Sequence, residues 1–394
     1  MYLLWGVATN PAHAQFTILH MGAAGSSFEA IDFSSPDIGY ATGKDGSVFK
    51  TTDAGFYWDP LTTGSGAYLF DVSFLNDSVG FVSGGGATVL KTIDGGASWT
   101  PLTLPFTECI YQVQPITGSL VYAAGWGGNF FRSTDGGDNW TNIAIDPGWQ
   151  GWVFGMEFRD ADTGFVAQAD GRIYKTVDGG LGWAQSSTST TNTLRGISMP
   201  SATTGYAAGF FGTVQKSTNG GAAWTTVNTG YPNDSYYGVH FTDADHGVIC
   251  GGFYSGGNWQ GVIMRTGNGG STWSRVLASG PVLNGITVNG ASTFAVGVIE
   301  VIQSDLFSTS VEGSVFEDHL SVFPNPFDDR IMITSTDLGN NTLYQLFTLT
   351  GELVLNGALH NGTIDTQSVQ AGCYVLQVHN ASGGSLGRTL VVKL

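Results

Sequence analysis

Short stretches in which apolar and polar residues alternate follow one another from residue 15 to about residue 307, separated by glycine-rich turns. In one unit these stretches span residues 69–74, 80–83 and 88–92, and a fourth begins at Trp99. Successive side chains of a β-strand point to opposite faces, so alternation with a period of two predicts strands. We therefore expect an all-β chain in which four short strands make up each unit.

Each unit carries the same short sequence at the turn before its fourth strand. A Ser or Thr is followed two residues later by Asp or Asn, and then by Gly and Trp, as in residues 92–99 (TIDGGASW). The tryptophans that end these boxes, spaced by 41, 41, 43, 41 and 49 residues, are Trp58, Trp99, Trp140, Trp183, Trp224 and Trp273. Asp accepts hydrogen bonds from turn amides, and Gly permits a positive φ. Because the box recurs once per unit, its Asp or Asn is predicted to form the turn and not to act in catalysis.

The spacing of the boxes predicts the architecture. A repeat of about 40 residues with several short strands is typical of a β-propeller, because one repeat cannot bury its own apolar faces. The first three strands occur seven times, but only six units continue into a fourth strand that begins with Trp. Residues 15–19 stand one repeat before Trp58, and pairing them with the last unit would cover two exposed strand edges. We expect a seven-bladed propeller over residues 15–307, closed by its N-terminal strand; six blades are the alternative.

One polar residue near the end of each first strand is predicted to face the axial channel, and the third of these strands is expected to end at Val113. The ring consists of Asp32, Ser73, Gln112, Glu157, Ser198, His240 and Thr287. Their sequence neighbours are apolar, so alternation places the polar set on one face. The ring is interpreted either as a hydrated channel or as the floor of a binding site. A glycoside hydrolase that uses Glu157 with Asp32 is the enzymatic alternative.

Aromatic residues gather in loops that are predicted to lie at one rim of the propeller. The candidate ligand-binding rings are Trp126, Trp149, Trp152, Phe211, Tyr236, Tyr254 and Trp259, and they join Glu157, His240 and Gln112 in the predicted site. Aromatic side chains in loops give large contact areas at low entropic cost. The insertion at residues 253–261 lengthens the last interval and lies on the same rim, where repeat proteins often carry their function.

Charge narrows the range of partners. The chain has 14 Lys and Arg residues against 31 Asp and Glu, a net charge of −17, and six of its basic residues each directly precede a box. No basic stripe remains for a phosphate backbone, which disfavours nucleic acid and anionic membranes. The three cysteines lie far apart in the sequence, at Cys109, Cys250 and Cys373, so they predict buried thiols. We expect no disulfide, metal site or cofactor.

The box, with Lys or Arg before it, resembles the Asp-box (BNR, neuraminidase-type) repeat. Together with residues 39–43 (GYATG) and 205–209 (GYAAG), it is most similar to propellers related to photosystem II stability and assembly factors. The resemblance covers residues 15 to about 307 and implies the fold. Sialidases, glucanases and non-enzymatic binders share this repeat, so the resemblance does not imply a single function.

A different module begins at His319. Its motifs, at residues 322–327 (VFPNPF), 346–354 (LFTLTGELV), 372–378 (GCYVLQV) and 391–394 (VVKL), are similar to the type A C-terminal sorting domain of the type IX secretion system of Bacteroidetes-type bacteria. The resemblance implies a small Ig-like β-sandwich over residues 319–394, recognised by an outer-membrane translocon, after a linker at 308–318. A carbohydrate-binding sandwich is the alternative.

The N-terminus also indicates export. The apolar residues 3–8 followed by Ala12-His13-Ala14 predict a signal peptide at residues 1–14, and no apolar run is long enough for a spanning helix. The sequence therefore predicts a secreted or outer-surface propeller that is not an enzyme and binds a glycan or protein ligand through its aromatic rim.

Overall fold

The computed structural model describes residues 17–21, 27–55, 57–148, 151–277, 282–290, 292–297, 300–304, 321–323, 330–334, 342–348, 353–359, 362–370, 372–379 and 385–393. The chain forms two compact units, Met1–Ser308 and Thr309–Leu394. Among the described residues, helical turns occur only at Lys44–Gly46 and Trp126–Gly128, so the chain is all-β. The predicted signal peptide, Phe16, Trp149 and the predicted linker lie outside the described residues.

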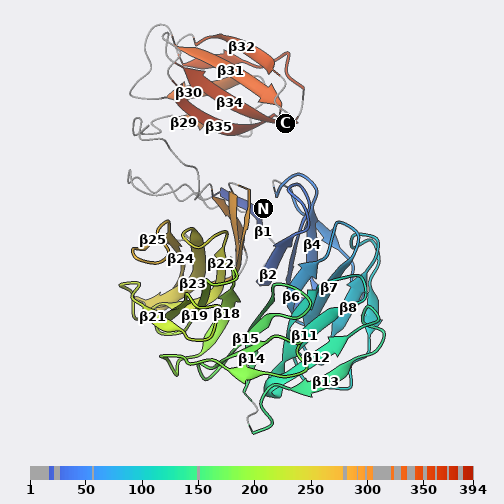
Figure 1. The fold of residues 1–394 in the computed structure, drawn as a ribbon. Coiled ribbons are helices and arrows are strands. Elements are labelled where there is room, and N and C mark those ends of the chain that lie inside the picture. The colour runs from blue at the N-terminus through green and yellow to red at the C-terminus, as the bar shows by residue number, and fades with distance from the viewer. Residues whose placement is uncertain are drawn as a thin grey trace. The chain divides into compact units, whose positions relative to one another are not determined.

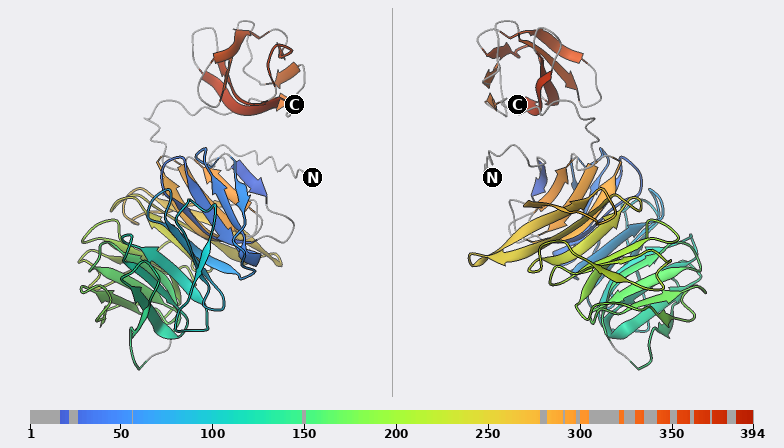
Figure 2. Two further views of the ribbon diagram at one scale, coloured as in Figure 1. Left: turned by 90° about the vertical axis from the view of Figure 1, so that its right-hand side faces the viewer. Right: turned by 60° about the vertical axis from the view of Figure 1, so that its left-hand side comes forward.

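Six sheets of the first unit are each built from four consecutive antiparallel strands arranged around a common axis (Figures 1 and 2). The first three are β2 (Phe28–Phe33), β3 (Gly39–Gly43), β4 (Val48–Thr51), β5 (Asp59–Leu61); β6 (Leu69–Phe74), β7 (Gly80–Gly84), β8 (Val89–Thr92), β9 (Thr100–Leu102); and β10 (Ile110–Pro115), β11 (Val121–Gly125), β12 (Asn129–Ser133), β13 (Thr141–Ala144). The next three are β14 (Val153–Phe158), β15 (Gly164–Gln168), β16 (Ile173–Thr176), β17 (Ala184–Gln185); β18 (Leu194–Ser198), β19 (Gly205–Gly209), β20 (Val214–Ser217), β21 (Thr225–Val227); and β22 (Ser235–Phe241), β23 (Gly247–Ser255), β24 (Asn258–Thr266), β25 (Ser274–Leu277).

The blade count predicted from the sequence is corrected by this arrangement. If a blade is a four-stranded sheet supplied by one continuous segment, the propeller has six blades and not the predicted seven. The remaining sheet of the first unit, here called the closing sheet, has the order β1-β28-β27-β26 and so joins strands from both ends of the propeller segment. These strands are β1 (Thr17–Met21), β26 (Leu283–Asn289), β27 (Ser292–Gly297) and β28 (Glu300–Ser304). The prediction counted every group of three strands as an equivalent blade, although this last group has no box.

The closing sheet connects the last blade to the first. β1 pairs antiparallel with β28, and Figure 1 shows it beside the strands of this sheet. On the other side, Phe28 and Ile31 of the first blade share a buried apolar cluster with Phe294 of the closing sheet. The Asn284 side-chain amide also donates to the Phe28 carbonyl oxygen over 2.9 Å. The ring of sheets is therefore held together without a covalent link.

The boxes form identical turns. Thr51 Oγ1 donates to Asp53 Oδ1 over 2.8 Å and accepts from the Gly55 N–H, and Asp53 Oδ1 also accepts from the Tyr57 N–H. The same three hydrogen bonds recur in all six boxes. The Lys before a box reaches the next one, as where Lys50 Nζ donates to the Gly95 carbonyl oxygen over 2.8 Å. Box and Lys therefore belong to the scaffold.

The second unit contains two sheets. One has the order β29-β30-β33 and the other β32-β31-β34-β35. Its strands are β29 (Ser321–Phe323), β30 (Arg330–Thr334), β31 (Leu343–Thr348), β32 (Leu353–Ala358), β33 (Thr363–Asp365), β34 (Gly372–His379) and β35 (Ser385–Lys393). Ile331, Leu346 and Leu376 from both sheets lie in one buried cluster. The Ig-like topology predicted for this unit is not confirmed.

Candidate ligand-binding face

The polar residues of the inner strands join neighbouring blades. Asp32 Oδ2 accepts a hydrogen bond from the Phe74 N–H over 2.8 Å, and Glu157 Oε2 accepts one from the Met199 N–H over 2.9 Å. Ser198 Oγ accepts the Phe241 N–H in the same way. Each of these bonds runs from the inner strand of one blade to the inner strand of the next. They give Asp32, Glu157 and Ser198 of the predicted channel ring a structural role.

The third blade differs from its predicted alignment. Its inner strand ends at Pro115 and not at Val113, so Gln114 takes the place in the ring that was predicted for Gln112. Gln114 accepts from the Phe158 N–H and donates to the Phe158 carbonyl oxygen, whereas Gln112 Nε2 donates only to the neighbouring Tyr111 carbonyl oxygen.

Pro115 also explains an exception in the second blade. Pro115 has no N–H to offer at the position that corresponds to Phe74. The second blade therefore uses Asp71, whose Oδ2 accepts the Val113 N–H over 2.9 Å.

Burial shifts the pKa values of the titratable side chains on the inner strands. Desolvation raises the pKa of Asp32 to about 6, of Glu157 to about 7 and of Asp71 to about 8, against the opposing effect of their backbone hydrogen bonds. Desolvation lowers the pKa of His240 to about 4, so its imidazole is neutral at pH 7. Each shift favours the uncharged form, as expected for titratable groups held away from water.

Five of the seven predicted aromatic residues lie exposed at one rim of the propeller. The exposed fractions are 38% for Trp126, 38% for Trp152, 68% for Phe211, 63% for Tyr254 and 45% for Trp259. Trp126 and Phe211 lie in turns between second and third strands, and Trp152 directly precedes β14. Tyr254 and Trp259 lie near the tip of the hairpin formed by β23 and β24, and all these segments are at the same end of the blades. Tyr236 is fully buried in a core cluster, so its ring is not part of this surface.

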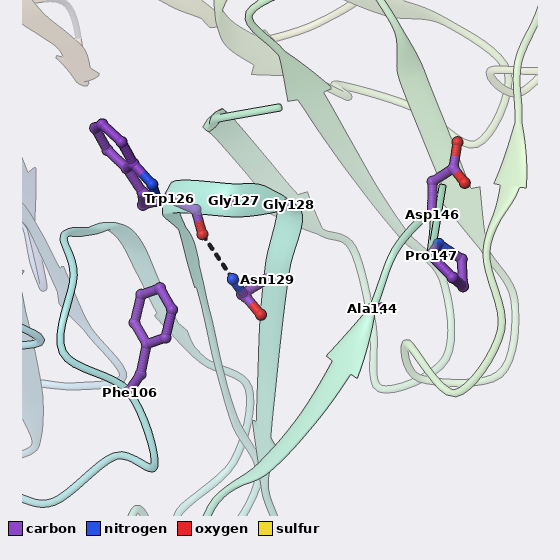
Figure 3. Close-up of a pocket in the computed structure, with 8 residues that line it drawn as sticks. All are labelled: Phe106, Trp126, Gly127, Gly128, Asn129, Ala144, Asp146 and Pro147. Atoms are coloured by element: carbon purple, nitrogen blue, oxygen red, sulfur yellow. Dashed lines mark hydrogen bonds between the residues drawn. The ribbon is translucent and has the colours of Figure 1, made fainter. Parts of the chain in front are cut away.

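Trp126 and Trp152 are stacked on each other, with ring centroids 4.6 Å apart and an interplanar angle of 30°. A depression of about 310 Å³ lies beside Trp126, lined also by Phe106, Asn129 and Asp146 (Figure 3). The Trp126 ring points away from Asp146 in this view. Asp146 accepts from the Tyr174 hydroxyl over 2.9 Å and pairs with Arg172, so its charge is already compensated.

The long hairpin of β23 and β24 carries a second exposed pair. Tyr254 and Trp259 are directly opposite each other across the hairpin, with ring centroids 5.8 Å apart. The base of the hairpin is anchored by Arg275, whose guanidinium lies 4.1 Å from the Phe253 ring centroid and forms an ion pair with Asp234. This is the insertion that was predicted to lie on the rim.

A further circle of side chains lies at the rim end of the inner strands, and the sequence analysis did not identify it. Here called the inner ring, it consists of Glu29, Phe70, Tyr111, Phe154, Arg195, Tyr237 and Asn284. Ring centroids are 5.0 Å apart for Phe70 and Tyr111 and again 5.0 Å apart for Tyr111 and Phe154. The Arg195 guanidinium lies 4.1 Å from the Phe154 centroid, and Asn284 Nδ2 donates to Glu29 Oε1 over 3.2 Å. All members except Phe154 are half-buried.

A β-bulge explains why the inner ring was missed. The pairing between first and second strands shifts by one residue at the same place in each sheet, between Phe28 and Ala30 in the first blade and between Leu69 and Asp71 in the second. A bulge breaks the period-two alternation on which the face assignment depended. Aligning the seven units by these positions would have shown an aromatic, charged or amide side chain in every copy.

The part of the chain that the structure describes offers no metal site and no membrane-spanning helix. It contains no group of three or more metal-ligating side chains, and no helix that is long and apolar enough to cross a membrane. Cys109 and Cys250 are free thiols, and Cys250 is buried.

Comparisons with known proteins match a segment of each unit to a protein family. Residues 58–198 match the family described as photosynthesis system II assembly factor YCF48, and residues 321–393 match the family described as secretion system C-terminal sorting domain. No curated protein matches the chain.

Several solved structures resemble the chain. YCF48 from Cyanidioschyzon merolae is 19% identical, with a TM-score of 0.61 over 74% of this chain and 98% of that one. A structure titled YCF48 bound to D1 peptide is 16% identical, with a TM-score of 0.61 over 75% and 95%. A GH74 xyloglucanase from Xanthomonas campestris is 14% identical, with a TM-score of 0.62 over 93% of this chain and 59% of that one. At these identities the similarity shows the fold alone.

The two matched segments agree with the repeats and motifs from which they were predicted. The chain carries a YCF48-type propeller segment at residues 58–198 and a type IX secretion sorting domain at residues 321–393, which indicates a secreted or outer-surface protein.

Proposed function

We propose that the propeller is a non-enzymatic binding module that recognises a glycan or protein ligand through its aromatic rim. The observation that carries this proposal is the exposure of five aromatic rings at one end of the blades. Soluble proteins normally bury such rings, and exposed clusters of them mark interaction sites. The sorting domain then provides export, and the type IX translocon is its partner.

The rim is continuous with the inner ring. Trp152 stacks on Trp126 on one side and contacts Phe154 edge-on at 5.6 Å on the other. The aromatic surface therefore extends from an exposed turn towards the axis of the propeller. An extended ligand that lies along this path would contact flat apolar faces in succession, with the polar groups of the inner ring at its end.

Two ligand classes fit an aromatic surface. A relative of similar fold, YCF48, has been solved with a D1 peptide, which makes a peptide one candidate for this chain. A glycan is the other, because sugar rings present C–H faces that pack on aromatic side chains.

Hydrolysis of a glycan is the second candidate function, and it is supported by the similarity in fold to two GH74 enzymes. It would use Glu157 and Asp32. Each of these carboxyl groups accepts a main-chain N–H of the neighbouring blade, so one oxygen of each is committed to the scaffold. This commitment supports binding over catalysis.

The test compares binding with turnover. The purified protein is screened against a glycan array and a peptide library, and assayed with a panel of aryl glycosides and sialosides. We expect binding to one class, reduced about 5- to 100-fold by Trp126→Ala or Trp259→Ala. Turnover of any glycoside that is lost in Glu157→Gln would establish the hydrolase instead. Unchanged affinity in both Trp variants would remove the rim from the site.

A further inference from the structure

We infer that the inner ring is a subsite for one uncharged pyranose unit of a glycan, with Glu29 and Arg195 as its hydrogen-bonding pair and the aromatic rings as its floor. This inference rests on the proposed binding function and names the ligand class.

Glu29 offers one carboxylate oxygen to a ligand. Its Oε1 accepts from the Tyr68 hydroxyl, from Ser27 Oγ at 3.5 Å and from Asn284 Nδ2 at 3.2 Å. These contacts fix the orientation of the carboxyl group. Oε2 accepts no hydrogen bond from any residue that the structure describes. A carboxylate oxygen has two acceptor positions, so Oε2 can receive a donor from outside.

Arg195 offers donors in the same place. Its guanidinium is held by ring faces, 4.1 Å from the Phe154 centroid and 5.4 Å from the Tyr237 centroid. Its Nε is buried and has no hydrogen-bond partner, and no carboxylate of the described residues lies within ion-pair distance of it. A buried donor without a partner carries a free-energy cost that an acceptor from a ligand would remove.

Glu29 and Arg195 are close enough to affect each other electrostatically, yet they do not form an ion pair. The positive charge of Arg195 opposes the rise that burial causes in the pKa of Glu29. The Glu29 carboxylate in turn opposes the fall that burial causes in the pKa of Arg195. Both residues stand at the bulge of their inner strands, and so at the same end of the ring, and no ion pair joins them.

The opposite charges select for a ligand without net charge. A carboxylate would gain from Arg195 and lose to Glu29, and an ammonium group would do the reverse. A hydroxyl group can accept from Arg195 and donate to Glu29 at once. Neighbouring hydroxyls on one sugar ring would satisfy both residues.

The remaining members of the ring fit the other face of a sugar. Phe70, Tyr111 and Tyr237 are half-buried and present aromatic surface around the pair, and the buried Phe154 leads to Trp152 on the rim. The C–H face of a pyranose can pack on these rings while its hydroxyls meet Glu29 and Arg195. The next sugar units would then extend over Trp152 and Trp126.

The experiment uses the full chain and defined oligosaccharides. Isothermal titration measures binding of cellohexaose, xylohexaose, mannohexaose and galactan-derived hexaose, with oligogalacturonate as the acidic comparison. We expect one neutral oligosaccharide to bind and the acidic one to bind more weakly. Glu29→Gln keeps the shape of the side chain but replaces one acceptor oxygen with a donor. It should weaken binding about 10- to 100-fold, as should Arg195→Gln.

The matched control is Glu108→Gln, which removes the same charge from an exposed position in a loop of the same rim. It should leave the affinity unchanged. Thermal unfolding of each variant shows whether the propeller is intact.

The outcomes separate the two proposals. Sugar binding that is lost in Trp126→Ala but unchanged in Glu29→Gln and Arg195→Gln would overturn the subsite and leave the binding function standing. Preference for the acidic oligosaccharide, or binding of peptides alone, would also overturn it. If neither sugars nor peptides bind, both proposals fall.

Discussion

The side chain of Glu157 accepts a hydrogen bond from the main-chain N–H of Met199 on the neighbouring blade, over 2.9 Å. Asp32 and Ser198 make the same kind of contact at equivalent places around the axis. The inner polar residues thus complete the backbone hydrogen bonding where adjacent inner strands do not pair with each other. A buried N–H without a partner is costly, which gives these positions a structural reason to be polar.

Glu157→Gln should change the pH dependence of stability. Burial raises the pKa of Glu157 to about 7, so the folded protein holds a proton that the unfolded chain loses near pH 4.5. The contribution of Glu157 to stability is therefore complete below pH 4.5 and is lost as the pH rises through 7. Gln still accepts the Met199 N–H and cannot ionise. From pH 5 to pH 8, the free energy of unfolding of the variant should rise by roughly 2 kcal/mol relative to that of the natural protein, as measured by urea unfolding.

The control for this prediction is Glu157→Ala. It cannot ionise either, but it leaves the Met199 N–H unpaired, so it should be about 1–3 kcal/mol less stable than Glu157→Gln at both pH values. Parallel pH profiles for the natural protein and the Gln variant would contradict the prediction.

His240 should have the opposite effect at low pH. Burial lowers the pKa of its imidazole to about 4, below the unfolded value of 6.5. The unfolded chain then binds the proton first, so stability is complete above pH 6.5 and is lost as the pH falls towards 4. The free energy of unfolding of His240→Gln, taken relative to that of the natural protein, should be roughly 1–2 kcal/mol higher at pH 5 than at pH 7. Urea midpoints at the two pH values test this, and an equal difference at both would show that His240 does not titrate in this way.

The stacked pair on the rim should contribute to stability as well as to binding. Trp126 and Trp152 lie with ring centroids 4.6 Å apart and are each 38% exposed. A double-mutant cycle with Trp126→Ala and Trp152→Ala should give a coupling free energy of about 0.5–1.5 kcal/mol for unfolding. Additive effects of the two substitutions would mean that the stack contributes nothing in solution.

Phe211 combines an exposed ring with an unfavourable backbone. Its φ is 58°, in the left-handed region, and its side chain is 68% exposed. Gly adopts this conformation freely, whereas Ala does not. Phe211→Gly should therefore be about 1 kcal/mol more stable than Phe211→Ala, as measured by thermal unfolding. If Phe211 is a ligand contact, both variants should lose the same affinity, since both lack the ring. Equal stability of the two variants would show that the turn relaxes.

Several features could be predicted because the interactions that form them lie within one short segment of the chain. The box requires Thr51, Asp53 and Gly55 at fixed positions along one short turn, and all three hydrogen bonds are local. Export was predicted from the terminal motifs, which also act within one segment. The exposed aromatics Trp126 and Trp259 were found because they lie between the repeated strands, although the segment that holds Trp259 is an extension of the hairpin of β23 and β24. Tyr236 was misassigned because it stands next to a loop in sequence, but its ring points into the core.

The amino-acid sequence alone determined the all-β repeat, the box turns and the sorting module, because each depends on contacts among residues that are near one another in the chain. The sequence also predicted that the N-terminal strand pairs with the last group of strands, whereas only the tertiary structure decided which inner residues meet. The closing sheet joins β1 to β28 across the whole propeller, and Glu29 meets Asn284 from the opposite end of it. The bulge in each inner strand takes Glu29 and Arg195 out of the alternation of apolar and polar residues, so their equivalent places in the ring became visible only in the fold.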